Sequence, residues 1–153
     1  MIRIRQFLKG RDEGPWLEIL NRAFSEYEDF RPWTMDDFRD WESSPYFNAE
    51  GMFIAEVDGK PVGIVEAYID RKGQEKKGFI RKLSVIPEFR RLRVGRALLE
   101  RAIERLVMLA WSMLKPWLER EKWSVRACLS RMALRLFELL VGWRGIYITY
   151  PQT

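Results

Sequence analysis

The chain has 153 residues, of which 47% are hydrophobic and 32% are charged, a composition typical of folded globular proteins rather than disordered ones. No linker, repeat or low-complexity segment divides it, so we expect one domain over residues 1–153. The net charge of +5 favours anionic ligands without choosing among phosphates, nucleic acid and acidic lipid. The absence of histidine removes the commonest metal ligand and the usual general base.

The single cysteine, Cys128, excludes an intramolecular disulfide and a cysteine-rich zinc site. Apolar neighbours favour a core position for it over a nucleophilic role. The start MIRIRQFLKGRDEG lacks the apolar core of a secretory signal, and the apolar run 106–118 is too short to span a bilayer. We therefore predict a cytoplasmic protein with no metal and no membrane partner.

The first half of the chain changes pattern several times. The opening IRIRQF alternates apolar and basic residues, as a strand does. Apolar residues then recur at helical spacing from Pro15 to Tyr27. Thr34 precedes two acids in TMDDF, which indicates the start of a second helix. MFIAEV and KPVGIVEAYI flank Asp58-Gly59 and predict a hairpin, because Asp-Gly tolerates the positive φ angles of tight turns.

The second half continues with strand and helix patterns. A polar turn over 71–78 leads to a third strand, 79–85, and Pro87 ends it. An amphipathic helix begins at Val94. The later segments read as a strand, a helix and a final strand: 123–129, 130–140 and 145–150. This order predicts a mixed α/β domain in which helices pack on one sheet.

The junction SVIPEFRRLRVGRALLERAIERL, residues 84–106, joins a strand end to a helix start. The first amides of a helix lack intrahelical partners and lie at the positive end of its dipole, so they form an anion site. Gly95 would let a phosphate approach the backbone closely. Four guanidinium groups that suit phosphate oxygens surround it: Arg90, Arg91, Arg93 and Arg96. The residues alone leave open a pyrophosphate site and a solvated basic turn.

The junction resembles the acetyl-CoA-binding motif of the GCN5-related N-acetyltransferase (GNAT) superfamily. In that family a strand ending in L-x-V-x-P leads to Q/R-x-x-G-x-G/A and then to a helix. The match here is Leu83-Ser84-Val85-Ile86-Pro87, then Arg90-Arg91-Leu92-Arg93-Val94-Gly95-Arg96-Ala97. A second family signature, A-x-x-L-Y/F followed by G-F/W, looks like SRMALRLFELLVGW at 130–143.

The resemblance implies an α/β (α+β) fold with a mostly antiparallel mixed sheet, a splayed parallel strand pair and helices on both faces. Strand 79–85 would splay from strand 123–129 and admit the pantetheine arm of acetyl-CoA. Backbone groups of Leu83, Ser84 and Val85 would pair with the pantetheine amides. The loop residues that would surround the pyrophosphate are Arg90, Arg91, Leu92, Arg93, Val94, Gly95, Arg96 and Ala97. The implied chemistry is direct attack of an amine on the thioester, accelerated by positioning and oxyanion stabilisation.

Several positions depart from the family pattern. Arg93 replaces the first glycine of the loop, which we expect to be tolerated if this residue has helical angles. The strand FIRKLSV lacks the family's glutamate base, and the nearest carboxylate on a neighbouring strand is Glu66. Glu66 is a candidate base, although we favour its lying on the solvated side of its strand. Phe137 replaces the tyrosine that protonates the leaving thiolate, so Tyr147, or alternatively Tyr150 or solvent, would serve instead.

The segment 107–122 and the acceptor side are less defined. VMLAWSMLKPWLEREK would extend the preceding helix, cover the wedge as a lid, or form a homodimer interface; we favour the interface. A reading-frame anomaly in the gene is a further alternative. In the family, the acceptor pocket lies beside the first two helices, where Glu26 and Tyr27 are weak candidates for amine binding. Asp36 and Asp37 fit helix capping better.

We therefore predict an acetyl-CoA-dependent N-acetyltransferase whose acceptor is an amine of a small molecule, a protein N-terminus or a lysine. The alternative is a non-catalytic or weakly active acyl-CoA-binding module of the same fold, suggested by Phe137 and the missing strand glutamate. A nucleic-acid-binding protein is the least favoured reading, because glutamates interrupt the basic surface of the helix after Val94.

Overall fold

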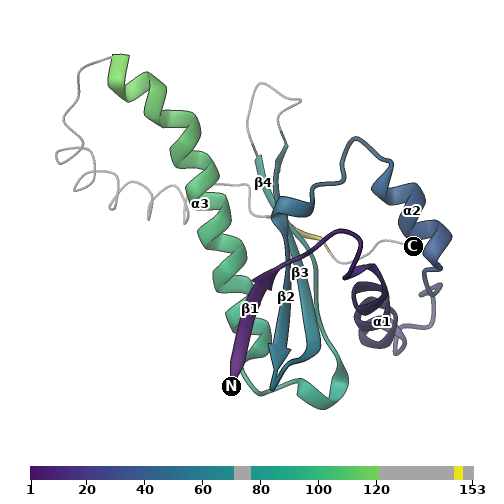
Figure 1. The fold of residues 1–153 in the computed structure, drawn as a ribbon. Coiled ribbons are helices and arrows are strands. Elements are labelled where there is room, and N and C mark those ends of the chain that lie inside the picture. The colour runs from purple at the N-terminus through teal and green to yellow at the C-terminus, as the bar shows by residue number, and fades with distance from the viewer. Residues whose placement is uncertain (71–76, 121–146, 150–153) are drawn as a thin grey trace.

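A computed structural model of the chain describes residues 1–70, 77–120 and 147–149 (Figure 1). Its helices are α1 (Glu13–Phe24), α2 (Met35–Glu42) and α3 (Val94–Arg120), with short 3-10 turns η1 (Ala49–Gly51) and η2 (Pro87–Phe89). Its strands are β1 (Ile2–Gln6), β2 (Met52–Val57), β3 (Lys60–Asp70), β4 (Lys77–Val85) and β5 (Tyr147–Thr149). They form one sheet in the order β1-β2-β3-β4-β5.

The sheet is antiparallel from β1 to β4, and β5 joins β4 in parallel. The β2–β3 turn has φ angles of 49° at Asp58 and 80° at Gly59, which confirms the predicted hairpin. The expected parallel neighbour of β4 was 123–129, which lies outside the described residues. Splaying of β4 from that strand stays a prediction.

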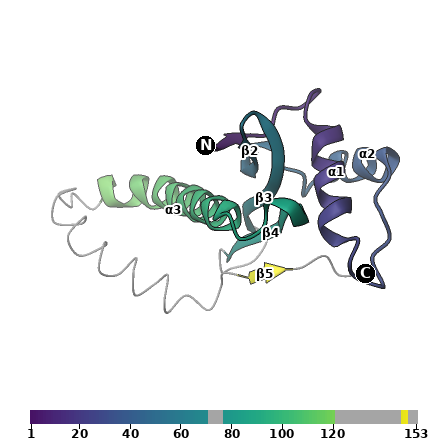
Figure 2. The same ribbon diagram turned by 90° about the horizontal axis from the view of Figure 1, so that it is seen from below.

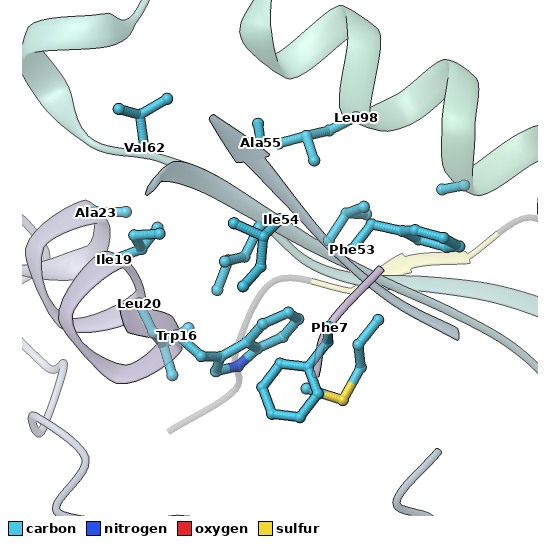
Figure 3. Close-up of a cluster of buried hydrophobic side chains, with 14 of the residues drawn as sticks. Phe7, Trp16, Ile19, Leu20, Ala23, Phe53, Ile54, Ala55, Val62 and Leu98 are labelled. Atoms are coloured by element: carbon cyan, nitrogen blue, oxygen red, sulfur yellow. The ribbon is translucent and has the colours of Figure 1, made fainter. Parts of the chain in front are cut away.

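Helices cover both faces of the sheet, as predicted. Figures 1 and 2 place α1 and α2 on one side and α3 on the other. On the α1 side, Trp16 and Leu20 point towards Ile54 of β2, whereas Leu98 of α3 lies near Ala55 on the opposite face (Figure 3). All five side chains are buried, so the alternating pattern of β2 divides one hydrophobic core into two layers.

A local signal marks the start of α2. Thr34 caps α2 through a capping box with Asp37, whose carboxylate accepts from the Thr34 amide at 2.7 Å. The capping role expected of Asp37 is therefore confirmed. The helix begun at Val94 continues to Arg120, so the first part of 107–122 extends α3. Cys128, Phe137 and Tyr150 lie outside the described residues.

Candidate functional site

The end of β4 has one paired edge and one open edge in the described part of the chain. Ser84 and Val85 lie opposite Ile64 and Gly63 of β3, whereas pairing with β5 covers only residues 79–81. A Cβ on Gly63 would lie 2.9 Å from Leu98 Cδ1 and 3.0 Å from Ser84 O, so glycine is needed there. Ser84 and Val85 are thus paired with β3, and no strand of the described residues pairs with the other edge of 83–85, where an extended ligand could add.

The start of α3 lies directly after this strand end and the turn η2. The first helical bond beyond the turn runs from the Ala97 amide to Arg93 O at 3.0 Å. In the described chain, no backbone hydrogen bond outside the helix ladder is made by the amides of residues 91–96. A Cβ added to Gly95 would meet only Val85 Cγ2, at an ordinary 3.7 Å. Packing within the protein therefore does not require glycine at this position.

The turn before α3 has two residues in left-handed backbone conformation. The φ angle is 62° at Arg91 and 65° at Arg93. We expected Arg93 to be tolerated through helical angles, but its φ lies in the left-handed region that favours glycine. The backbone at position 93 therefore has the conformation that favours glycine, the residue typical of the family here, although the residue is arginine.

The four arginines of the turn have different surroundings. Arg91 and Arg93 are exposed, and no carboxylate of the described residues lies within 4.0 Å of either guanidinium. Arg96 Nε donates to Glu100 at 2.8 Å and stays three-quarters exposed. Arg90 instead turns towards α1. Three cations are thus available to an anion at the helix start.

Arg90 fastens the turn to α1 and β4. Its guanidinium donates to Ala23 O at 3.0 Å, to Val85 O at 3.1 Å and to Glu26 Oε2 at 2.7 Å. These bonds use three of the five N–H donors of the guanidinium, so two remain for an anion. The same pair occupies Glu26, which was a weak candidate for binding the acceptor amine.

Glu66 is fully buried, which corrects our favoured interpretation that it lies on a solvated face. It lies opposite Met52 of β2, and Met52 belongs to the core. Glu66 Oε1 accepts from Arg81 at 2.9 Å, and Glu66 Oε2 lies 3.6 Å from Lys82 Nζ. The Oε2 atom has no hydrogen-bond partner in the described residues. A buried carboxylate is retained here because two cations face it.

Two consecutive residues of β4 reach the same carboxylate, which a regular strand does not allow. Successive side chains of a strand point to opposite faces. Here the β3–β4 register shifts between Ile64 and Glu66, and Lys82 has a φ angle of 53°. This irregularity has the character of a β-bulge, and it brings Arg81 and Lys82 together on one face.

Lys82 Nζ is enclosed by aromatic rings of the α2 region. It lies 3.1 Å from the Trp41 ring centroid and 4.9 Å from that of Trp33. Burial lowers the pKa of Lys82 to about 8, against the opposing attraction of Glu66 and with a smaller contribution from Arg81. The amine is therefore partly neutral near physiological pH.

Arg81 and Tyr68 complete the cluster. The Arg81 guanidinium carbon lies 4.2 Å from the Tyr68 ring centroid, and Tyr68 stacks on Phe79 at 5.2 Å. Burial raises the pKa of the Tyr68 hydroxyl. Tyr147 lies opposite Phe79 in the β4–β5 pairing, so the backbone of the candidate acid runs beside the strand that carries Arg81 and Lys82.

The described residues contain no group of three or more acidic or cysteine side chains that could hold a metal ion. Among these residues, no helix combines the length and the apolar character needed to cross a bilayer.

Comparison with known proteins identifies the family. The sequence model of the Acetyltransferase (GNAT) family matches residues 15–138. The chain belongs to this family. Its relatives include mycothiol acetyltransferases of Stackebrandtia nassauensis, 38% identical over 63% of this chain and 32% of the relative, and of Streptomyces griseus, 25% identical over 94% and 46%. The GNAT chain thus spans less than half the length of these relatives.

Solved structures share the fold. A GCN5-related N-acetyltransferase from Sphaerobacter thermophilus has a TM-score of 0.55 and 25% identity, covering 67% of this chain and 30% of that chain. The ribosomal-protein-S18-alanine N-acetyltransferase of Escherichia coli has a TM-score of 0.51 and 24% identity, covering 69% and 59%. N-acetylglutamate synthase from Neisseria gonorrhoeae, complexed with coenzyme A, has a TM-score of 0.51 and 19% identity, covering 69% and 22%.

The anion site at the start of α3 stays a prediction, whereas the buried cluster beside it was not predicted from the sequence. Arg81 and Lys82 were expected only to stand where the family has a glutamate. A usable signal was present: two adjacent cations stand inside the otherwise apolar strand FIRKLSV. Such a pair in a buried strand requires a buried counter-ion, and Glu66 on the neighbouring strand supplies it.

Proposed function

We propose that this chain is an acetyl-CoA-dependent N-acetyltransferase that transfers the acetyl group to an amine by direct attack in a ternary complex. The observation that carries the proposal is the strand end at 83–85, whose second edge has no partner among the described residues, placed directly before the start of α3. Family membership and the mycothiol acetyltransferase relatives support the same activity.

In this proposal acetyl-CoA is a substrate. Its pantetheine amides pair with the open edge of Leu83, Ser84 and Val85 as an added strand would. Its pyrophosphate binds the first amides of α3, where Gly95 leaves room, and Arg91, Arg93 and Arg96 contribute charge. The side chain of Arg90 holds the turn in shape and keeps two N–H groups for the phosphate.

The amine attacks the thioester carbonyl, and the carbon–sulfur bond breaks. A CoA thiol has a pKa similar to that of cysteine, so the thiolate can leave near neutral pH with little assistance. Phenylalanine at position 137 is therefore compatible with transfer. Tyr147 remains the candidate acid, and the candidates for the base are Glu66 and its neighbour Lys82.

The test is calorimetric titration with CoA and acetyl-CoA. Charge reversal in Arg91→Glu and Arg93→Glu should each weaken binding at least about tenfold, because a hydrogen bond to a charged group contributes about 1.5–3 kcal/mol. Arg3→Glu is the matched control, since Arg3 is an exposed residue of β1. Wild-type protein that binds neither ligand, or two loop variants that bind as tightly as Arg3→Glu, would remove the proposal.

A CoA-binding module without catalysis is the second candidate, favoured by Phe137. Turnover of acetyl-CoA with a panel of D-glucosamine, a tetrapeptide with a free N-terminal alanine, and spermidine separates the two. Release of the CoA thiol with any of these amines excludes the non-catalytic module. Tight CoA binding without turnover would favour it over the enzyme.

Self-association through the segment 107–122 is the remaining part of the proposal. Met108 of α3 is 60% exposed, and an apolar side chain at the edge of a small domain favours a covering partner. A homodimer should be converted to monomer by Met108→Glu, as measured by light scattering after gel filtration. A wild-type chain that is monomeric at high concentration would contradict the dimer.

A further inference from the structure

The bulge in β4 changes where a side chain of the strand points. In a regular strand Lys82 would lie on the face opposite Arg81, towards α3. With φ at 53°, it instead lies beside Glu66 and under the rings of Trp33 and Trp41, on the face that carries α1 and α2. Lys82 also directly precedes residues 83–85, the strand edge assigned above to the pantetheine. Its amine therefore lies between the donor edge and the helices on the acceptor side.

We propose that Lys82 is the catalytic residue that accepts the proton from the acceptor ammonium, with Glu66 and Arg81 as positioning residues. The inference rests on the proposed transfer reaction and assigns its base. The Lys82 side chain keeps 12% of its surface exposed, whereas Glu66 has none. Of these two side chains, only that of Lys82 therefore has surface that an acceptor could approach in the described chain.

The charges around Lys82 suit this role. The charged groups that face it are Glu66 from β3 and Arg81 from β4, and the contacts from the α2 side are tryptophan rings. With its pKa lowered to about 8, the amine has a much larger neutral fraction at pH 7.5 than an ordinary lysine. An ordinary lysine would be neutral in only about one molecule in a thousand at that pH. A base with a pKa near the working pH is the favourable case for proton transfer.

The protons of the step balance. The neutral Nζ of Lys82 takes one proton from the acceptor ammonium, and the amine nitrogen then forms a bond to the thioester carbonyl carbon. When the carbon–sulfur bond breaks, the electron pair leaves with sulfur, and the second proton of the attacking nitrogen goes to the thiolate. The Lys82 ammonium returns its proton to solvent. The products are the amide, the CoA thiol and one released proton.

Glu66 and Arg81 oppose each other in their effect on Lys82. The carboxylate favours the ammonium form of Lys82, and the guanidinium disfavours it. Glu66→Gln should therefore lower the pKa of Lys82, and Arg81→Gln should raise it. If Glu66 itself were the base, Glu66→Gln would abolish transfer at every pH instead of moving the pH profile.

The first measurement needs no acceptor substrate. Trace labelling with acetic anhydride across pH 6–11, followed by mass spectrometry of the peptides, reports the pKa of each lysine. We expect the midpoint for Lys82 near 8, well below the 10.4 or so of an ordinary lysine. A Lys82 midpoint at the ordinary lysine value would overturn the proposal.

The second measurement is the pH dependence of acetyl-CoA turnover with the three-amine panel. Wild-type kcat should rise with pH through about 8, the pKa of Lys82. Lys82→Arg and Lys82→Met should lose this inflection and fall about 10²- to 10⁴-fold in rate, the range of general base catalysis, with CoA affinity unchanged. A wild-type rate and pH profile in either variant would refute the role of Lys82 but leave the proposed transfer reaction standing. Wild-type protein that binds CoA but turns over no amine would remove the transfer reaction and its base together.

Discussion

The left-handed turn before α3 makes Arg93→Gly a stabilising substitution. A non-glycine residue in this conformation costs about 1–2 kcal/mol, and glycine would relieve that strain at φ 65°. Glycine also loses more backbone entropy on folding, about 0.5–1 kcal/mol relative to alanine. The net expectation is a free energy of unfolding that rises by about 0.5–1 kcal/mol, or a Tm higher by roughly 1–4 °C for a domain of this size.

The control is Arg96→Gly, three residues later in the same turn and helix. It removes the same charge from an exposed arginine, but position 96 lies within α3, where glycine weakens the helix. Urea unfolding at pH 7.5 without ligand should therefore show opposite signs for the two variants. If both variants were destabilised alike, the left-handed backbone at Arg93 would not be the source of strain, and the reasoning would fail.

Two other predictions concern positions far from the cradle. A Cβ on Gly51 would lie 2.0 Å from Ala67 O, so Gly51→Ala should lower the free energy of unfolding by about 3 kcal/mol or more. A Cβ on Gly14 would have no atom within 4 Å, so Gly14→Ala should leave the free energy of unfolding unchanged or raise it by up to about 1 kcal/mol. Equal effects of the two substitutions in urea unfolding would contradict this packing. Burial opposes ionisation of Asp12, but bonds from Arg5 and the Leu8 amide hold its pKa below the ordinary value. The stabilising contribution of Asp12 is therefore present above about pH 4 and is lost as pH falls through the lower folded pKa. The loss of unfolding free energy in Asp12→Asn relative to wild type should therefore be larger at pH 7 than at pH 2.5. A loss that is independent of pH would refute this prediction.

The anion site proposed at the start of α3 depends on features that are local in sequence. The strand end, the proline after it and the helix start are adjacent along the chain, so their order places the first helix amides beside residues 83–85. The backbone conformations of the turn could not be predicted from the sequence. Nothing in RRLRVG distinguishes a left-handed Arg93 from a right-handed one, and the attachment of the turn to α1 through Arg90 involves residues distant in sequence.

The buried cluster marks the limit of that argument. Alternation along FIRKLSV predicts opposite faces for Arg81 and Lys82, and an isolated glutamate in IVEAYI suggests a solvated side. Both expectations assume a regular strand. The register shift between β3 and β4 breaks that assumption, and Glu66 and Lys82 are sixteen positions apart in sequence but 3.6 Å apart in space.

Elements whose causes lie within a few residues could be predicted from sequence: the alternation of β1, the Asp58-Gly59 hairpin and the cap at Thr34. The burial of Glu66, the attachment of Arg90 to α1 and the position of Lys82 under Trp41 came from the tertiary structure alone. The physical reason is how far apart in sequence the interacting residues lie. Caps and turns are satisfied by neighbours along the chain, whereas a bulge and its buried ion pairs depend on how separate strands and helices meet across the sheet.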